Sequence, residues 1–275
     1  MKAEVVISPP DGGRMLSEEE FIGELAAAGI VTGIRTETIN ALCNEPVYNK
    51  SFIVAEGIRP VHGINGKLEF LFDVNKNHRP QILEDGRVNF RELNLIENVF
   101  KGQELVRLVP PVPGVPGQDI FGNEIPCLTG KAAVLPKGRN VEYSQDENAL
   151  VSTIDGQVCF TNGKVNVFAV YEVPTDVDNS TGNINFVGNV IVRGNILSGF
   201  VVEAGGDVEV FGVVEGAVIK AGGSVVLHRG MQGLNKGVIT AEHDIAARYI
   251  ENSNLDAKGN IKAEVIMHSN IKCGN

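Results

Sequence analysis

The sequence predicts a mixed fold, in which an N-terminal α+β domain is followed by a single-stranded parallel β-solenoid, also called a β-helix. Three observations support this prediction. The hydrophobic periodicity changes often within residues 1–168, as it does where short helices and strands alternate. A pattern of about 17 residues then recurs through residues 169–275. Glycine contributes 32 of 275 residues and aromatic side chains only 6%, which favours many short strands and tight turns.

Two short helices are expected near the N-terminus. Residues 17–20 read Ser-Glu-Glu-Glu, a capping box in which the Ser17 hydroxyl and the Glu20 carboxylate each accept a backbone hydrogen bond. The first helix therefore begins at Ser17, and Gly29 is a natural C-terminal stop. A second helix is expected over residues 36–43, where Ile39, Leu42 and Cys43 share one face.

Short strands are expected over residues 51–56, 67–72, 87–90 and 104–109, because each run is flanked by Gly, Asn or Pro. Residues 157–168 predict a hairpin. Its centre, Asn162-Gly163, can supply both positive φ angles of a type I′ turn. Gly63-Ile-Asn-Gly66 predicts a further hairpin turn rather than a phosphate-binding loop, because no helix with a following Lys-Ser/Thr comes after it.

The second domain repeats an apolar residue, a polar residue and a mostly small residue before each turn. The apolar members, spaced by 18, 17, 20, 16 and 16 residues, are Ile184, Val202, Ile219, Ile239, Leu255 and Ile271. Two inward-facing residues follow each turn, and Gly205-Gly206 and Gly222-Gly223 mark equivalent corners. Because no unit can bury its apolar side alone, the coils stack at roughly 4.8 Å. We expect a right-handed coil, since strict six-residue repeats are missing.

Residues 110–126 hold five prolines and three glycines, a composition that cannot continue a β-ladder. The segment predicts a semi-rigid, partly polyproline loop. Two interpretations are open. The loop presents Pro113, Pro116, Ile120 and Phe121 to another protein, or Ile120 and Phe121 fold back and cover a sheet edge.

The 20-residue coil carries a second candidate docking segment, the excursion over residues 229–236. Arg229, Met231 and Leu234 are its candidate contact residues. A loop that bulges from a solenoid is more often simply tolerated length than a binding site.

Charge and composition exclude several classes of partner. The net charge is −10, with 16 basic and 22 acidic residues up to residue 168 and 8 and 12 after it. Neither half therefore has a basic face for nucleic acid. No apolar run approaches the roughly 20 residues that span a bilayer, so no membrane insertion is expected. The widely spaced cysteines and the absence of a secretory leader after Met1-Lys2 fit a reducing cytoplasm.

No catalytic, cofactor or metal site is predicted. Nucleophilic catalysis has no constellation, because the cysteines lack an evident base. His228, His243 and His268 differ in their position within the coil, and no cysteine or carboxylate joins them at a ligand spacing. We therefore expect a non-enzymatic scaffold that binds other proteins.

Two alternatives to the scaffold use the same solenoid. A hexapeptide-like acyltransferase is suggested by Val202, Val208 and Val214, which are six residues apart. The register then slips, and no histidine falls within an otherwise well-kept six-residue repeat with an acidic partner to act as base. A carbohydrate-binding or carbohydrate-acting solenoid needs an aromatic or acidic stripe, and the aromatic residues of this half do not recur at one coil position.

Several segments resemble the flagellar assembly protein A family of bacteria. They are residues 52–61 (FIVAEGIRPV), 94–114 (NLIENVFKGQELVRLVPPVPG), 118–125 (QDIFGNEI) and 180–195 (STGNINFVGNVIVRGN). The resemblance covers essentially the whole chain. It implies an N-terminal α/β domain and a β-solenoid, a cytoplasmic bacterial protein, and a role in flagellar assembly or polar placement through protein contacts. It also implies, as a partner, a sugar-phosphotransferase IIA component, and it supplies no catalytic motif.

Members of this family usually continue into more solenoid and a helical, often coiled-coil, tail, whereas this sequence stops at Asn275. We therefore expect it to be a fragment of a longer protein. Its last coil is expected to expose strand edges and apolar residues such as Ile266 and Ile271. End-to-end pairing of two solenoids is the expected consequence.

Overall fold

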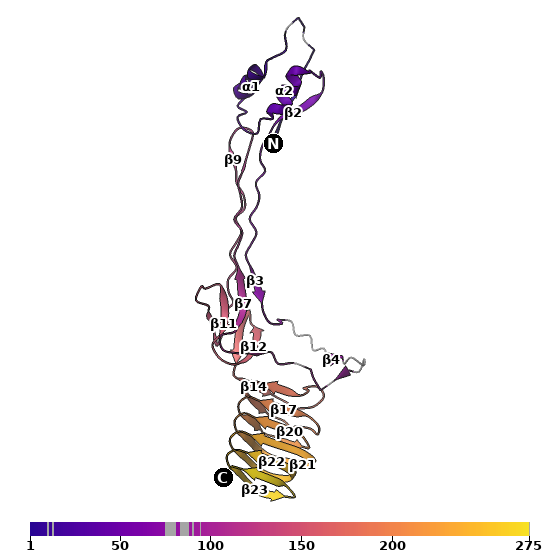
Figure 1. Cartoon of the computed structure of the whole chain (residues 1–275), viewed down its shortest axis with the longest axis vertical. Helices are drawn as coiled ribbons and strands as arrows, with labels where there is room; N and C mark the ends of the chain where they lie inside the picture. The colour runs from indigo at the N-terminus through magenta and orange to yellow at the C-terminus, as the bar shows by residue number, and fades with distance from the viewer. Residues whose placement is uncertain are drawn as a thin grey trace. The chain divides into compact units, whose positions relative to one another are not determined.

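The fold was analysed in a computed structural model of the chain, drawn in Figure 1. The structure describes residues 1–274 apart from residues 10, 13, 75–80, 83–87, 90 and 94, and only the backbone of residues 81–82 and 88–89. The chain divides into two compact units. One comprises Met1–Leu68 with Leu108–Val134, and the other comprises Glu69–Arg107 with Leu135–Asn275.

The first unit begins with a small α/β arrangement. Strand β1 (Lys2–Val6) pairs antiparallel with β2 (Ser51–Glu56), and helices α1 (Glu18–Ala27) and α2 (Thr36–Asn44) lie between them in sequence. Their core joins both helices to the sheet through Phe21, Ile39, Leu42 and Val54. Both helices and β2 were predicted from the sequence, whereas β1 was not.

Helix α1 begins as its capping box predicts. The Ser17 hydroxyl accepts from the Glu20 N–H at 3.3 Å, and the Glu20 carboxylate accepts from the Ser17 N–H at 2.9 Å. These two bonds satisfy backbone donors that the first turn of a helix leaves without partners. The helix ends before Gly29, whose φ of 81° is the left-handed conformation expected after a helix C-terminus.

Three extended segments of this unit lie side by side, and we call them the rod (Figure 1). They are residues 57–66, 111–118 and 124–133. The first two run antiparallel and exchange backbone hydrogen bonds of 2.8–3.1 Å at every third residue. These pairs are Ile58 with Gln118, Val61 with Val115, and Ile64 with Val112. The second and third segments are joined by a hairpin of β8 (Gly117–Gln118) and β9 (Glu124–Ile125).

The third segment contributes hydrogen bonds with the same repeat. The Gly63 N–H donates to the Leu128 carbonyl at 2.8 Å, and the Gly66 N–H donates to the Lys131 carbonyl at 2.9 Å. A repeat of three residues is that of a polyproline II helix, and strands of this kind pack closely in collagen when glycine recurs at the axis. The proline-rich segment is thus an extended strand of a rod rather than a loop.

Small residues occupy the axis of the rod. Every third residue is buried or half-buried, and the residues between are mostly exposed. A Cβ atom on Gly63 would lie 2.6 Å from both the Gly130 nitrogen and the Val112 carbonyl oxygen. The prediction that Gly63 and Gly66 form a hairpin turn is therefore wrong, because their lack of a side chain is used for close packing of backbones. The axial residues are Gly57, Pro60, Gly63, Gly66, Pro111, Gly114, Gly117, Cys127, Gly130 and Ala133.

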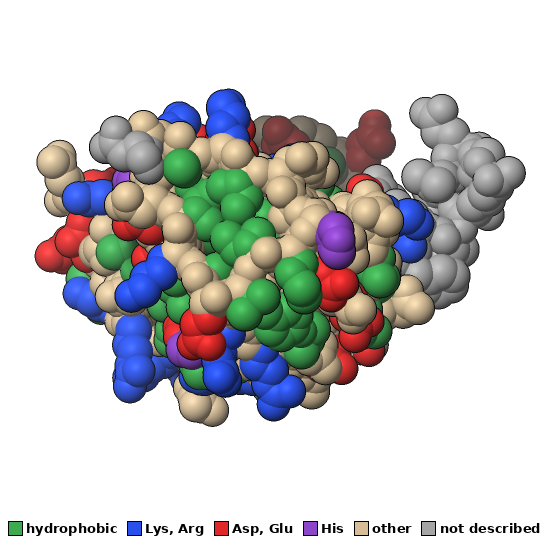
Figure 2. All heavy atoms as spheres, turned by 90° about the horizontal axis from the view of Figure 1, so that it is seen from below, with side chains coloured by type: hydrophobic (Ala, Val, Ile, Leu, Met, Phe, Trp, Pro, Cys, Tyr) green, Lys and Arg blue, Asp and Glu red, His purple; other side chains and the backbone are tan. Residues whose placement is uncertain are grey.

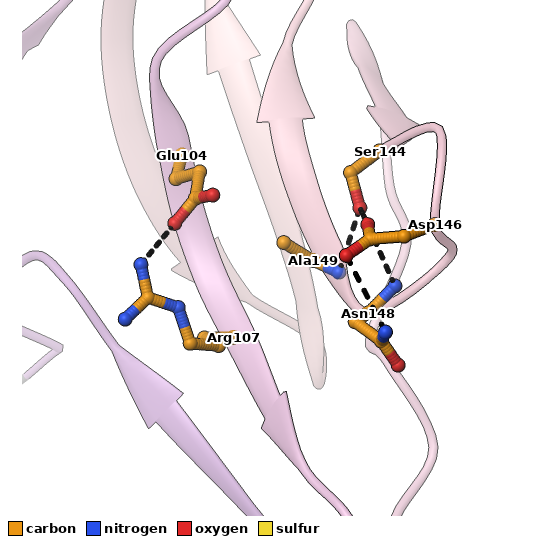
Figure 3. Close-up of polar contacts among 6 residues, drawn as sticks. All are labelled: Glu104, Arg107, Ser144, Asp146, Asn148 and Ala149. Atoms are coloured by element: carbon orange, nitrogen blue, oxygen red, sulfur yellow. Dashed lines mark hydrogen bonds and ion pairs between the residues drawn. The ribbon is translucent and has the colours of Figure 1, made fainter.

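A four-stranded antiparallel sheet has the order β10 (Val141–Tyr143), β11 (Ala149–Ser152), β7 (Glu104–Val109) and β3 (Lys67–Phe70). The turn between β10 and β11 is held by side chains, as Figure 3 shows. The Asp146 carboxylate accepts from the Ser144 hydroxyl at 2.5 Å, and Ser144 Oγ accepts from the Ala149 N–H at 3.0 Å. Glu104 and Arg107 form an ion pair of 2.5 Å on β7.

The predicted hairpin of residues 157–168 is present. Strands β12 (Gly156–Thr161) and β13 (Lys164–Phe168) pair from Gln157 with Phe168 to Thr161 with Lys164, and β12 also pairs with β6 (Asn98–Val99). Asn162 and Gly163 have φ angles of 53° and 71°, as a type I′ turn requires. The short strands β4 (Gln81–Ile82) and β5 (Val88–Asn89) also pair, and both ends of the predicted strand 87–90 lie outside the described residues.

The remaining strands form the parallel β-solenoid, coloured orange to yellow in Figure 1. The six apolar residues that define the predicted repeat, from Ile184 to Ile271, pair directly from coil to coil in the predicted register. The coil's handedness stays a prediction. The strands are β14 (Val170–Val173), β15 (Ile184–Phe186), β16 (Asn189–Val192), β17 (Val201–Ala204), β18 (Val208–Val210), β19 (Val213–Glu215), β20 (Val218–Ala221), β21 (Val225–Ala241), β22 (Ile245–Ala257), β23 (Ile261–Met267) and β24 (Asn270–Cys273).

Inward side chains of successive coils stack into continuous columns. Four of the columns follow the predicted positions, two before each turn and two after it, and a fifth runs along the strands that pair with β19. Nearly all members are fully buried, and they belong to one core cluster that runs from Val173 to Ala257. The fifth column, which the sequence pattern did not reveal, comprises Val177, Ile196, Val214, Met231, Ile250 and Ile266.

The columns predict that substitutions of inward residues lower the free energy of unfolding much more than substitutions of outward residues. Ile219→Ala should lower the free energy of unfolding by about 2–5 kcal/mol, because it removes a fully buried side chain and leaves a cavity. Val226→Ala, at an exposed position on β21, should change it by less than about 0.5 kcal/mol. Urea denaturation followed by far-UV circular dichroism measures both. Equal losses for the two variants would contradict the inward assignment.

The close packing of the rod predicts that adding one methyl group at its axis destabilises the first unit. Gly63→Ala should destabilise the first unit by about 1–3 kcal/mol, because the added Cβ meets backbone atoms that cannot rotate away. Gly23→Ala is the matched control: it lies in α1 with no neighbouring atom within 4 Å, and should stabilise by about 0.5–1 kcal/mol. Differential scanning calorimetry compares the two, and a neutral Gly63→Ala would argue against the close packing of the rod.

Candidate protein-interaction surfaces

The predicted excursion of residues 229–236 lies within β21 and contains one core residue. Met231 is fully buried and stands in register between Val214 and Ile250 of the neighbouring coils. Its proposed place in a docking surface is therefore corrected, because a side chain without exposed area cannot contact a partner. Its thioether fills the solenoid interior instead.

The exposed part of the excursion is a short bulge. The register of β21 against β22 shifts between Gln232 and Gly237, where the longer coil accommodates its extra residues. Leu234 and Asn235 there have φ angles of 50° and 58°. Leu234 is 48% exposed in this left-handed conformation, which is uncommon for a leucine. Arg229 is exposed as well, so Arg229 and Leu234 remain candidates for docking.

The turn between β8 and β9 separates the two residues that the sequence placed together. Ile120 is buried against Ile30 and Ala55, and its carbonyl accepts from the Val31 N–H at 2.9 Å. Ile120 thus folds back into the core of the first unit and is removed from the docking candidates. Phe121 stays half exposed, so its role in docking stays a prediction.

Asp119 holds this turn in place. Its carboxylate Oδ1 accepts from the N–H groups of Phe121 and Asn123 at 2.9 and 2.8 Å, and Oδ2 accepts from the Asn123 side-chain amide at 3.0 Å. The Asn123 amide, with these backbone donors, holds the pKa of the Asp119 carboxyl below its ordinary value. The side chain is buried, so the hydrogen bonds replace its hydration.

Pro113 and Pro116 are exposed on the second segment of the rod. Each precedes an axial glycine, Gly114 or Gly117, and follows an exposed valine, Val112 or Val115. The prolines fix the backbone in the extended conformation that the rod needs, since their φ is confined near −65°. This structural role is visible, whereas docking at Pro113 and Pro116 stays a prediction.

A ladder of polar side chains supports one corner of the solenoid. Every member but the last accepts a hydrogen bond from the backbone N–H of the equivalent residue in the next coil, for example from the Asp207 N–H to Asn189 Oδ1 at 2.9 Å and from the Ser224 N–H to Asp207 Oδ1 at 2.7 Å. This ladder was not predicted from the sequence. Its signal was an Asn, Asp or Ser after each turn: Asn189, Asp207, Ser224, Asp244 and Asn260.

An outward column on the solenoid combines aromatic and charged groups. The Arg193 guanidinium lies 4.6 Å from the centroid of the Phe211 ring, and Phe211 stacks on His228 at 4.2 Å. Glu172 accepts from Arg193 Nε at 2.6 Å, and Glu209 Oε1 lies 2.6 Å from His228 Nε2. His228 is therefore part of a packed surface column. Within the described residues, no three His, Cys, Asp or Glu side chains are grouped as metal ligands.

Ion pairs also connect equivalent positions of successive coils. Lys220 pairs with Glu203 at 2.7 Å and Lys272 with Asp256 at 3.0 Å, and Lys258 pairs in the same way with Glu242. All are solvent-exposed pairs, each worth about 0–1 kcal/mol. In these pairs each lysine lies next to an acidic side chain, so they do not form a surface patch of one charge sign.

The last coil presents an apolar surface. Figure 2 looks onto this end of the solenoid, where hydrophobic side chains gather at the centre and charged side chains surround them. Val265, Ile266, Met267 and Ile271 are 40–48% exposed there. The exposure of Ile266 and Ile271 is as predicted, and end-to-end pairing of solenoids stays a prediction.

A polar cavity of about 420 Å³ lies in the second unit, where Glu92, Leu95, Ile96 and Asn98 face the first coils. Asn98, Tyr171, Asn183, Asn185 and Glu203 are among its lining residues. Asn98 connects its walls by donating to the Asn185 carbonyl at 3.1 Å, and burial raises the pKa of the Tyr171 hydroxyl. The described lining residues include no cysteine, histidine or lysine.

Two of the cysteines are held in the thiol form by burial. Burial raises the pKa of the Cys43 and Cys159 thiols, which lowers the fraction of the reactive thiolate. Cys273 occupies the small-residue column after Ala257, as the repeat predicted.

Among the helices of the described residues, none combines the length and the apolar character that crossing a membrane requires.

Comparisons with known proteins match both parts of the chain. Residues 1–163 match the family model described as Flagellar Assembly Protein A N-terminal region. Residues 169–275 match the model described as Flagellar Assembly Protein A beta solenoid domain. Searches of curated proteins and of solved structures found no match.

The Asp119 turn predicts a dependence of stability on pH. Its folded pKa lies below the ordinary value of about 3.9, so the turn contributes stability above that value and loses it as the pH falls through the folded pKa. Asp119→Asn should therefore lower the melting temperature of the first unit at pH 7 and flatten its decline below pH 4. Calorimetry over pH 2.5–7 tests this. Glu124→Gln, an exposed carboxylate in the same hairpin, should change neither quantity.

Proposed function

Because the chain belongs to the flagellar assembly protein A family, we propose that it serves bacterial flagellar assembly as a non-enzymatic scaffold that holds other proteins. The observation that carries this proposal is the match of both family models, which together span nearly the whole chain. This family is not known as a family of enzymes. The cytoplasm, with placement at a cell pole, is the proposed location.

The packing of the solenoid supports a scaffolding role. Nearly all residues of its inward columns are buried, and backbone pairing links each coil to the next over the whole domain. Repeats joined in this way keep outward residues at fixed separations and offer an extended binding surface. A rigid surface of this kind suits a protein that positions partners.

We propose Phe121, Pro113, Pro116, Arg229 and Leu234 as contact residues for partners. All five are exposed, and none belongs to a buried core cluster of the described residues. Aromatic and arginine side chains contribute most of the binding energy in many interfaces, which favours Phe121 and Arg229. Ile120 and Met231 are absent from this set because they are buried.

Flagellar or polar proteins and a sugar-phosphotransferase IIA component are the proposed partners. Isothermal titration calorimetry with the purified IIA protein of the same bacterium tests the second proposal, with a Kd in the micromolar range as the expected result. Absence of heat at 100 µM of both proteins would end the IIA proposal and would leave the role in flagellar assembly untouched.

The flagellar role is tested by complementation. A strain of the source bacterium that lacks the gene should show fewer flagella by electron microscopy, and the full-length protein should restore them. Arg229→Ala with Leu234→Asn should restore them poorly, because the contacts are lost while asparagine still tolerates the positive φ at residue 234. Point substitutions are preferable to deleting residues 110–126, since that deletion removes a strand of the rod.

A matched control substitutes an exposed pair elsewhere on the solenoid. Lys262→Ala with Val226→Ser removes one basic and one aliphatic side chain and should restore flagella fully. If the deletion strain is normally flagellated, the proposed role is wrong. If the excursion variant complements as well as wild type, the docking assignment of Arg229 and Leu234 fails.

The acyltransferase alternative predicts binding of a cofactor. A ligand that binds the native state raises its melting temperature. Saturating acetyl-coenzyme A should leave the melting temperature of the chain unchanged in a thermal-shift assay. A rise of several degrees would overturn the non-enzymatic assignment.

A further inference from the structure

We propose that two copies of this chain associate through their rods. The contact surface is a set of five aliphatic side chains that we call the aliphatic face: Ile58, Val61, Ile64, Val112 and Val115. The proposal concerns self-association and does not depend on the flagellar role.

The hydrogen-bonded pairs of the rod bring these side chains together. Val61 lies directly opposite Val115, and Ile64 lies directly opposite Val112. Residues directly opposite each other in an antiparallel pair point to the same side, with Cβ atoms about 5 Å apart. Ile58 continues the row three residues before Val61, one polyproline turn of about 9 Å away. The five side chains thus form two adjacent rows on one side of the rod.

The aliphatic face is unusually exposed. Its five members are 52–66% exposed, and none takes part in a core cluster of the described residues. The reason lies in the axis of the rod, where glycine, proline and other small residues leave no space for a larger side chain. The rod therefore has little apolar interior of its own, and these five aliphatic side chains remain exposed. Contiguous exposed apolar surface of this kind marks an interaction site.

The size of the face fits a dimer. An aliphatic side chain of this size buries on the order of 100 Å² when covered. Five of them present on the order of 500 Å² per copy, or on the order of 1,000 Å² for two copies, the lower limit for a specific interface. Backbone atoms and the prolines beside the rows add to this area.

The chemistry of the face favours a second copy over a charged partner. None of its five residues carries a charge, so it offers nothing to select a basic or acidic protein, and the net charge of −10 does not act within the contact. Rows with a fixed spacing are self-complementary, since the gaps of one copy accept the side chains of the other across a two-fold axis. With the two rods antiparallel, the two Arg59 side chains, next to Ile58, lie at opposite ends of the contact.

Sedimentation velocity of the full chain tests the proposal. At 50 µM the wild type should have an apparent molecular mass of twice the 29.4 kDa of one chain. Val61→Ser with Val115→Ser should raise the dimer dissociation constant at least tenfold, because both substitutions place hydroxyl groups in the centre of the contact. The two residues are exposed, so the folded structure should persist, and an unchanged far-UV spectrum and melting temperature verify this.

Two controls separate this contact from others. Leu128→Ser, on the third segment of the rod, with Val134→Ser, just after that segment, alters more exposed aliphatic residues that do not belong to the aliphatic face, and should leave the dimer intact. Ile266→Ser with Ile271→Ser alters the open end of the solenoid and should also leave it intact. If the Val61/Val115 pair fails to fold, Ile58→Ser with Ile64→Ser replaces it.

Three results would overturn the proposal. The first is a wild-type chain that remains monomeric at 100 µM. The second is dimerisation that survives both pairs of substitutions on the aliphatic face. The third is dissociation by the Ile266/Ile271 pair alone, which would assign the association to the solenoid end.

Discussion

Close approach of backbone to backbone is the constraint on which both units depend. In the rod, the Gly63 N–H reaches the Leu128 carbonyl because Gly63 and the nearby Gly130 carry no side chain at the axis. In the solenoid, Gly222 sits against the carbonyl of Gly205 at a corner where one coil stacks on the previous one. The backbone groups then bond to the next pass of the chain, and the larger side chains are left to fill the interior of the solenoid or to cover the outside of the rod.

Much of the fold could be predicted because its signals are local or repeat in register. Asn162-Gly163 defines its turn from two residues, and the six apolar residues from Ile184 to Ile271 share one column. The rod could not be predicted, because its triplets are few and are divided among three segments, two of which lie about 50 residues from the first. Strand β1 alternates exposed and half-buried residues at an edge, so its pattern is weak.

The candidate surfaces were harder to predict than the fold, for a physical reason. Alternation along a strand reveals which residues point inward only while the register is continuous. The register of β21 slips beside Gln232, and so Met231 was placed outside although it lies in the core. Ile120 follows a segment of prolines with no period-two pattern, and its burial depends on Ile30 and Ala55, which are distant in sequence. Phe121 and Leu234, by contrast, are exposed on turns.

The corner ladder of Asn, Asp and Ser gives the solenoid a direction. Each side chain from Asn189 to Asp244 accepts its hydrogen bond from the coil that follows, as Asn189 does from Asp207 and Asp244 does from Asn260. Replacing one of these side chains therefore removes the acceptor of a backbone N–H in the following coil. The preceding coil keeps its hydrogen bond, because that bond uses only the backbone N–H of the replaced residue. A whole coil, in contrast, can be inserted or lost without leaving a donor unmatched. The length of such a solenoid can change in steps of one coil while the chemistry of every corner is preserved.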